Sequence, residues 1–311
     1  MDKCLSMDYA DMGRKAGDVG GATVKYYEVM QAMDISAGLA FWLTHWNWDI
    51  FLVGGVILVT IAYLYAIGPL RVKYQLGQEV PFSRALAFLL GADICFLALF
   101  TALDILADKY LFSAHMLQHM LLCFVGAPLM VLGIPAWFLR PLLRNRFFFA
   151  TWKGLTHPVV TSVLFCTNLW LWHAPVIYDA ALYNVQLHIV CHLLYIVTGM
   201  LFWWPLLGPV EGVWPPLSLG GKLAYLFFND MPMVLLGAGL TFMAPLYAPY
   251  LSAPRILGLA PDVDQQLGGL LMWIVGSIFF VVLASVIFLR WMLQQEKMER
   301  MAQANEASQK M

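Results

Sequence analysis

The sequence is divided into apolar stretches, each long enough to cross a membrane as a helix. Seven such stretches can be counted along its 311 residues, and a helix needs about 20 mostly apolar residues to span a bilayer. Only 12% of the residues are charged, about half the share usual in a soluble domain. We therefore predict an integral membrane protein. Its seven predicted spans lie near residues 48–68, 84–103, 113–134, 157–173, 187–207, 221–243 and 268–291.

These spans predict an all-α fold, a bundle of seven transmembrane helices in contact with the lipid bilayer. Turn-forming residues separate the spans, beginning with Gly68-Pro69 after the first. The predicted organisation is a polar N-terminal segment (1–46) that could form an interfacial helix, a membrane domain (47–293) and a polar cytoplasmic tail (294–311). The net charge of −1 provides no basic field that would attract nucleic acid.

Lysine and arginine are concentrated in alternate loops. The loop after the third predicted span contains Arg140, Arg144, Arg146 and Lys153, whereas the loop between the fourth and fifth spans contains neither residue type. Positive residues close to the ends of spans favour the cytoplasmic side. The N-terminus is therefore predicted outside and the C-terminus in the cytoplasm.

Two pairs of histidines carry the strongest functional signal. His115 and His119 begin the third predicted span, and His188 and His192 begin the fifth. Each pair has the spacing His-x3-His, which places both side chains on one face of a helix. Two imidazoles at this spacing can share a metal ion, with metal–nitrogen distances of about 2.0–2.1 Å. These four histidines are the first-choice metal ligands.

Further candidate ligands lie close to these pairs in the predicted topology. His173 ends the fourth span on the same side, and Asp264 precedes the seventh. Both are second-choice ligands. Asp264 could also orient a metal-bound imidazole or cap its own helix. Cys123 continues the stripe of His115 and His119 one turn deeper, and a sulfur ligand beside imidazoles favours copper.

Two acids fall within predicted spans, Asp93 in the second and Asp230 in the sixth. Acids in spans usually face the interior of the bundle and have a partner there. Met231 and Met233, beside Asp230, could act as soft ligands on a metal path, although packing is the ordinary role of methionine.

Several interpretations of the histidines remain open at this point. Histidines near helix ends can bond to a carbonyl group or lie among the lipid headgroups. Pairs of histidines can also hold haem in a membrane electron carrier or oxidoreductase. A metal permease would need polar residues that continue to the other face, and only Asp93 and Asp230 are candidates. His157, which precedes Pro158, is interpreted as a structural residue at a helix start.

Several motifs occur in the order typical of one family. They are His115-Met-Leu-Gln-His119, Gly126-Ala-Pro-Leu-Met, Trp170-Leu-Trp-His173-Ala-Pro, His188-x3-His192, Met231-Pro-Met233 and Asp264-Gln-Gln-Leu-Gly-Gly. Across residues 45–293 the chain resembles the multi-span CtaG family of cytochrome c oxidase assembly proteins. The resemblance implies a multi-pass protein of the bacterial inner membrane that is not itself an enzyme. It implies that the protein binds or presents copper to a cytochrome c oxidase subunit during assembly, on the outer side of the membrane.

Overall fold

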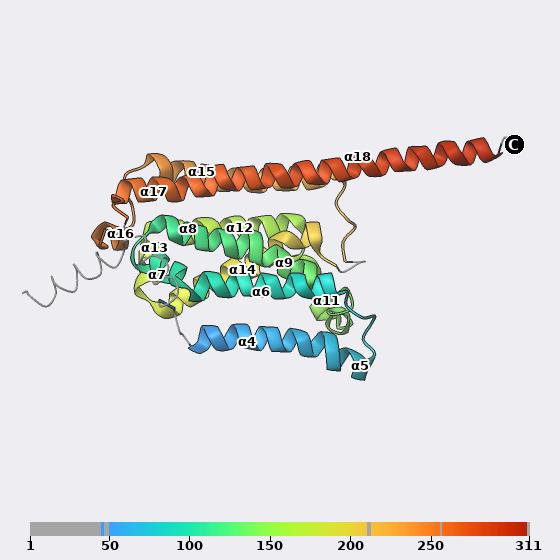
Figure 1. Ribbon diagram of the computed structural model, residues 1–311, viewed down its shortest axis with the longest axis horizontal. Helices are drawn as coiled ribbons and strands as arrows, with labels where there is room; N and C mark the ends of the chain where they lie inside the picture. Colours follow the sequence, from blue (N-terminus) through green and yellow to red (C-terminus); the bar gives the residue numbers. More distant parts are fainter. Residues whose placement is uncertain (1–44, 47–49, 210–212, 256, 310–311) are drawn as a thin grey trace, which may run out of the picture.

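Long helices running alongside one another form the structure (Figure 1), a computed structural model. It describes residues 45–46, 50–209, 213–255 and 257–309, and every regular element in these residues is helical. The N-terminal segment with its expected interfacial helix lies almost entirely outside the described residues. Six described helical segments are long and apolar enough to cross a membrane: Val53–Tyr74, Phe82–Phe100, Phe112–Gly133, Val185–Leu207, Leu219–Phe242 and Pro261–Gln303.

The fourth predicted span is a bent pair of helices. Helix α12 (Pro158–His173) has 16 residues, and α13 (Pro175–Tyr183) follows it at an angle of 74°. Pro175 lacks a backbone N–H and cannot continue the preceding helix, which explains the break. If this pair counts as one crossing, the described residues provide up to seven.

The first span differs from its prediction at its end. Helix α4 (Ile50–Tyr65) continues through the π-helical segment η1 (Ala66–Leu70) into α5 (Arg71–Tyr74). The predicted turn at Gly68-Pro69 is therefore wrong, because Pro69 lies inside a helix. A local π-helical turn can accommodate the hydrogen bond that proline cannot donate.

The third span is built from three consecutive segments that continue one another. They are α8 (Phe112–Met120), the π-helical η2 (Leu121–Gly126) and α9 (Ala127–Gly133). Helix α6 (Phe82–Phe100) packs tightly against them, since a Cβ atom on Gly91 would lie only 2.7 Å from the Gly126 carbonyl oxygen. Small residues allow this close approach of backbones, as in other membrane bundles.

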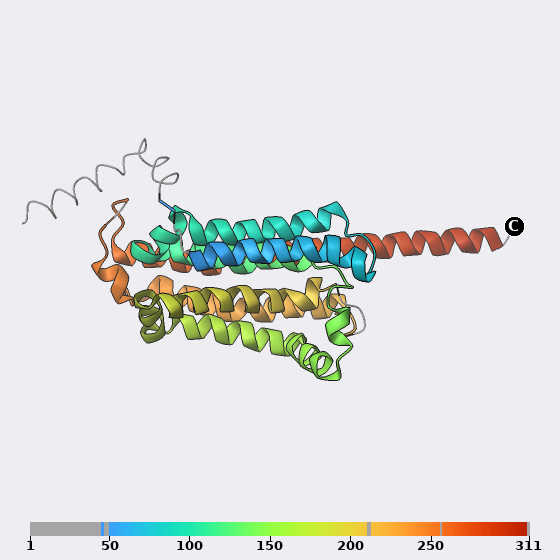
Figure 2. The same cartoon turned by 90° about the horizontal axis from the view of Figure 1, so that it is seen from below.

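The remaining long helices complete the bundle. Helix α18 extends well beyond the other helices (Figure 2), so the predicted tail is helical as far as Gln309. The remaining elements are α7 (Ala102–Lys109), α10 (Arg140–Leu143), α11 (Arg146–Leu155), α14 (Val185–Leu207), α15 (Leu219–Phe242), α16 (Ala248–Ser252), α17 (Pro261–Leu270), η3 (Leu271–Val275) and α18 (Gly276–Gln309).

The two ends of the bundle are formed by different elements. Helices α7, α13, α16 and α17 lie at one end, which we call the histidine end (Figure 1). Helices α5 and α11 lie at the other, towards which α18 extends, and we call it the basic end. Arg71 and Lys73 of α5 and Arg146 and Lys153 of α11 are at this second end.

Candidate metal centre

Three imidazoles converge at the histidine end. His115, His188 and His192 each provide one ring nitrogen, and these three nitrogens all lie within 4.8 Å of one another. Two nitrogens bound to one ion at about 2.0 Å each can be at most about 4 Å apart. Three nitrogens around one ion lie about 3.3–3.5 Å from one another, so side-chain rotations that shorten these separations by up to about 1.5 Å would bring this trio onto a single ion.

His119 joins the trio through His115. The Nε2 atoms of these two residues are 3.0 Å apart, and the ring of His119 lies 5.4 Å from that of His192. Two nitrogens 3.0 Å apart, each about 2.05 Å from one metal ion, would subtend an angle of about 94° at that ion. The histidine pairs of α8 and α14 therefore face each other, as their spacing predicted; their binding of a metal stays a prediction.

Tyr250 fixes the proton of His115. Its hydroxyl group donates to the Ala107 carbonyl oxygen at 2.7 Å, so it can only accept from the Nδ1–H of His115, 3.0 Å away. Tyr178 lies 3.0 Å from the same hydroxyl oxygen and donates to it. Burial raises the pKa of Tyr250, which keeps its hydroxyl group protonated at neutral pH. His115 is left with an unprotonated Nε2 that points at the cluster.

Asp108 fixes the proton of His188 in the same way. Its Oδ2 atom lies 3.4 Å from Nδ1 of His188, and the two side chains are only partly exposed. A carboxylate on the outer nitrogen of an imidazole sets its tautomer and makes the other nitrogen a better ligand. Asp108, at the end of α7, therefore lies at an imidazole, where the sequence suggested that Asp264 could lie.

Several imidazole nitrogens at this end have no partner. Nε2 of His188, Nε2 of His192 and Nδ1 of His119 are buried and make no hydrogen bond to any described residue. Buried polar atoms are almost always hydrogen-bonded in folded proteins, and each exception needs an explanation. A metal ion would satisfy the two Nε2 atoms, and neutral imidazoles are suitable ligands for it.

The two second-choice ligands lie outside the trio. Nδ1–H of His173 donates to the Leu169 carbonyl oxygen at 2.7 Å, and its Nε2 lies 3.2 Å from Sδ of Met116. Asp264 caps a neighbouring helix, since its carboxylate accepts from the amides of Phe112 and Ser113 at 2.7 and 3.1 Å. Asp264 was expected to orient an imidazole or to cap its own helix. Instead it caps the start of α8.

The two acids within spans have opposite orientations. Asp230 is buried and accepts hydrogen bonds from Ser277 of α18 at 3.0 and 3.1 Å, as expected for an acid facing the interior. Asp93 is exposed on the outside of α6, which corrects the expectation that it faces inward. Gly91, Ala92 and Cys95 occupy the buried face of that helix, and position 93 falls on the other side.

The candidate sulfur ligands differ in whether they face the interior of the bundle. Met233 is 2% exposed and Met231 is 36% exposed, so only Met233 faces the interior. Cys123 is buried, and its thiol donates to the Tyr195 carbonyl oxygen at 3.5 Å. His157 accepts from the amide of Val159 and caps α12, which confirms its structural role.

Sequence reasoning missed Asp108 and Tyr250. Asp108 lies in the short amphipathic helix α7, where Asp104 precedes it by one turn, and this acidic pair close to a histidine-bearing span was the available signal. Tyr250 lies far from every histidine along the chain, and only the fold of α16 brings it to His115. Its sequence context contains no comparable signal.

The fold and the site define a helical membrane protein with a buried histidine cluster. The family model described as cytochrome c oxidase caa3 assembly factor (Caa3_CtaG) matches residues 61–294. The chain therefore belongs to this family of assembly factors, as its motifs suggested.

Relatives in mycobacteria share about a quarter of the aligned residues with this chain. An uncharacterised protein of Mycobacterium bovis is 24% identical over 281 residues, and one of Mycobacterium leprae is 25% identical over 276 residues. Each alignment covers 82% of this chain but only 40% of the relative, so the chain spans less than half the length of these proteins. No solved structure matches the chain.

Proposed function

We propose that this protein binds one copper ion at the histidine end and presents it to a subunit of a haem–copper cytochrome c oxidase during assembly. The observation that carries the proposal is the convergence of His115, His188 and His192. Their Nε2 atoms lack protein donors, apart from the contact of His115 with His119, while Tyr250 and Asp108 hold two of the outer nitrogens. This is the arrangement expected around a bound metal.

Copper is favoured over zinc by the family and by the chemistry of the donors. Imidazole binds both metals, and the order of stability places Cu²⁺ above Zn²⁺ for the same ligands. The family's client is an oxidase, and copper is the metal that such an oxidase must acquire. Membership of an assembly-factor family also suggests a carrier without catalytic activity of its own.

A haem site is less compatible with the packing of the cluster. Ring centroids of the four histidines lie 4.2 to 6.1 Å apart in the pairs that make contact, and two of these pairs pack edge to face. A porphyrin between two axial imidazoles needs a flat slot between their rings. A permease is also disfavoured, since Asp93 points away from the bundle interior. A Soret band in the purified protein would show that haem is bound and would favour the haem site over the copper site.

We further propose that the histidine end faces the outside of the cell. The support is the excess of lysine and arginine in α5, α10 and α11 at the opposite end, since such residues favour the cytoplasmic side. A reporter fused after Lys310 should then be cytoplasmic, and one inserted at Asp179 should be external. Both reporters on one side would contradict this topology.

Metal analysis of the purified protein tests the proposal. After loading with Cu(II), we expect about one Cu(II) ion per chain in the wild type and a large loss in His188→Ala/His192→Ala, because removing two of three ligands leaves no site for this ion. His157→Asn is the matched control, since it removes an imidazole at the basic end and keeps an oxygen that can cap α12. Copper content that is equal in all three proteins would contradict the proposal.

A further inference from the structure

A small cavity lies beside the histidine cluster, and five of the eleven side chains that line it contain sulfur. Its volume is about 20 Å³, close to the space that one water molecule needs. It lies among α8, α12, α14, α15 and the π-helical segments η2 and η3, and π-helical turns are frequent at functional sites. The residues important here are Met116, Met120, Met233, Met272, His119 and His173.

The contact between His173 and Met116 has an unusual chemistry. Nδ1 of His173 carries the ring proton, because it donates to the Leu169 carbonyl oxygen at 2.7 Å. Its Nε2 therefore has a lone pair, and this nitrogen lies only 3.2 Å from the thioether sulfur of Met116, which also has lone pairs and no proton. Two acceptors this close gain little from each other, whereas a cation between them would bind both.

The distance fits two ligands of one ion. With metal–nitrogen and metal–sulfur distances of about 2.0 and 2.3 Å, a separation of 3.2 Å corresponds to an angle of roughly 95° at the metal. Met233 has room to reach this cavity because Gly276 has no side chain; a Cβ atom there would meet the terminal methyl group of Met233. Met116, Met233 and Met272 are at most 3% exposed, so no water competes from outside.

His119 connects the cavity to the cluster. Its Nε2 is 3.0 Å from Nε2 of His115, its ring also lines the cavity, and its Nδ1 is buried without a partner. The two nitrogens of an imidazole point in divergent directions. His119 is therefore placed to serve either site, and it does not belong to the closest three-nitrogen group.

We propose that this cavity is a second metal site, selective for Cu(I), with Met116, Met233 and His173 as its principal ligands. Thioethers favour the soft monovalent ion, and an apolar enclosure disfavours divalent ions, which are strongly hydrated. The proposal rests on the proposed function in one respect, since it supposes that copper is the cargo. The chain would then have two adjacent copper sites, one made of imidazoles and one made mainly of softer thioether ligands.

Silver titration of the full-length protein tests the second site, since Ag(I) imitates Cu(I) without redox chemistry. We expect Met116→Leu/Met233→Leu to lose one Ag(I) per chain together with the sulfur signal in X-ray absorption. Exchange of Met for Leu keeps the volume and is well tolerated. Met231→Leu is the matched control, because Met231 is a neighbouring thioether that points out of the bundle. Unchanged silver binding in the double variant would overturn the proposal.

Two further measurements separate the sites. His188→Ala/His192→Ala should lose copper at the cluster and still bind Ag(I) in the cavity; loss of both ions would mean that the cavity is not a separate site. Zn²⁺ binding by Met116→Leu/Met233→Leu should remain, because zinc prefers the imidazoles of the cluster. This retained zinc also shows that the variant is folded.

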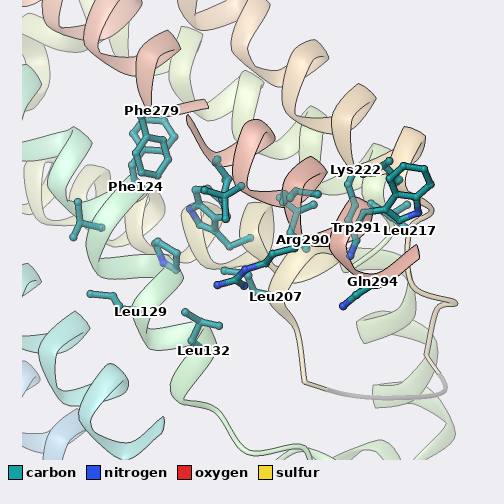
Figure 3. Close-up of a pocket in the computed structure, with 18 residues that line it drawn as sticks. Phe124, Leu129, Leu132, Leu207, Leu217, Lys222, Phe279, Arg290, Trp291 and Gln294 are labelled. Atoms are coloured by element: carbon teal, nitrogen blue, oxygen red, sulfur yellow. The ribbon is translucent and has the colours of Figure 1, made fainter. Parts of the chain in front are cut away.

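A different observation, at the basic end, supports a second and independent inference. A large cavity, of about 690 Å³, lies between α9, α14, α15 and α18 (Figure 3). Phe124 and Phe279 line one part of it, while Lys222, Arg290 and Trp291 gather at the other (Figure 3). No described carboxylate forms an ion pair with Lys222 or Arg290. The cavity is thus apolar inside and positively charged at one edge.

We infer that an anionic phospholipid occupies this cavity. Its acyl chain would lie against the aromatic and aliphatic wall, and its phosphate would lie between Lys222 and Arg290. Basic pockets between transmembrane helices are common sites for anionic headgroups, and Trp291 has the amphipathic ring typical of the membrane interface. The volume is within the usual range for small-ligand sites, about 300–1,000 Å³.

Native mass spectrometry with phosphatidylglycerol and phosphatidylcholine of identical acyl chains tests this inference. The wild type should retain phosphatidylglycerol preferentially, and Lys222→Gln/Arg290→Gln should lose that preference. Lys297→Gln is the control, because this lysine lies on the same helix but does not line the cavity. Equal retention of both lipids by the wild type, or an unchanged preference in the double variant, would overturn the inference.

Discussion

The long apolar helices run between the two ends of the bundle, but polar side chains have different surroundings at each end. At the histidine end, polar side chains are buried and paired across the fold, as in Tyr250 with His115 and Asp264 with the start of α8. At the basic end, Arg290 is exposed and the large cavity beside it is apolar. Burying a polar group is costly unless it has a partner. The unpartnered imidazoles at the histidine end therefore indicate a ligand buried within the bundle, whereas the charges at the basic end lie at the edge of an apolar cavity.

The largest effect should follow from removing the cluster at the histidine end. In cells that carry His115→Ala/His188→Ala/His192→Ala, we expect the oxidase polypeptides to be present but to lack copper and activity, because the converging nitrogens are gone. Oxidase activity and copper content in isolated membranes measure this effect. His157→Asn, at the basic end, should leave both near the wild-type values. Full activity in the triple variant would contradict the copper-presenting role.

A smaller effect should distinguish the two acids at the histidine end. Asp108→Asn should weaken metal binding about 10–100-fold, the usual cost of losing the carboxylate that orients a metal-bound histidine. Asp264→Asn should leave metal affinity within a few-fold of the wild type, because Asp264 contacts backbone amides of α8 and no imidazole. Competition with a chelator of known affinity measures both values. Unchanged affinity in Asp108→Asn would show that the contact between Asp108 and His188 has no role in binding.

The capping role of Asp264 predicts a loss of stability instead. Asp264→Ala should lower the free energy of unfolding by about 2 kcal/mol, the upper range for loss of a helix cap, since two amides lose a buried charged acceptor. Thermal unfolding in detergent measures this loss, and Asp262→Ala, on the same helix, is the control. Equal stability of the two variants would refute the capping role.

The smallest effect is expected at the basic end, where His157 caps α12. His157→Ala should lower the free energy of unfolding by about 1 kcal/mol and leave metal content unchanged. His157→Asn should recover most of that stability, since its side-chain oxygen can accept from Val159 as the imidazole now does. A loss of bound metal in His157→Ala would mean that the two ends are not independent.

Much of the fold could be predicted from local patterns. Apolar length locates the spans because each one has to satisfy its own backbone hydrogen bonds within the membrane. His-x3-His places two imidazoles on one face whatever the remaining fold, and this is why the facing pairs of α8 and α14 could be anticipated. His157 before Pro158 was also readable, since both residues act within a single helix turn.

The rest depends on contacts between residues far apart in the chain. Asp264 contacts Phe112 across a separation of 152 residues, and Tyr250 contacts His115 across 135. No local pattern distinguishes such a partner from the nearest turn or helix start. The outward orientation of Asp93 depends on which face of α6 packs against η2 and α9, and the helical Gly68-Pro69 depends on a local π turn.

X-ray absorption at the copper edge of the loaded, purified protein tests the central claim most directly. Under conditions that keep copper as Cu(II), the imidazole cluster predicts at least three nitrogen scatterers at about 2.0 Å, with the outer-shell pattern of imidazole rings. This pattern should disappear in His188→Ala/His192→Ala and persist in His157→Asn. Copper that shows no imidazole pattern in the wild type, or the same pattern in the cluster variant, would contradict the metal centre assigned to the histidine end.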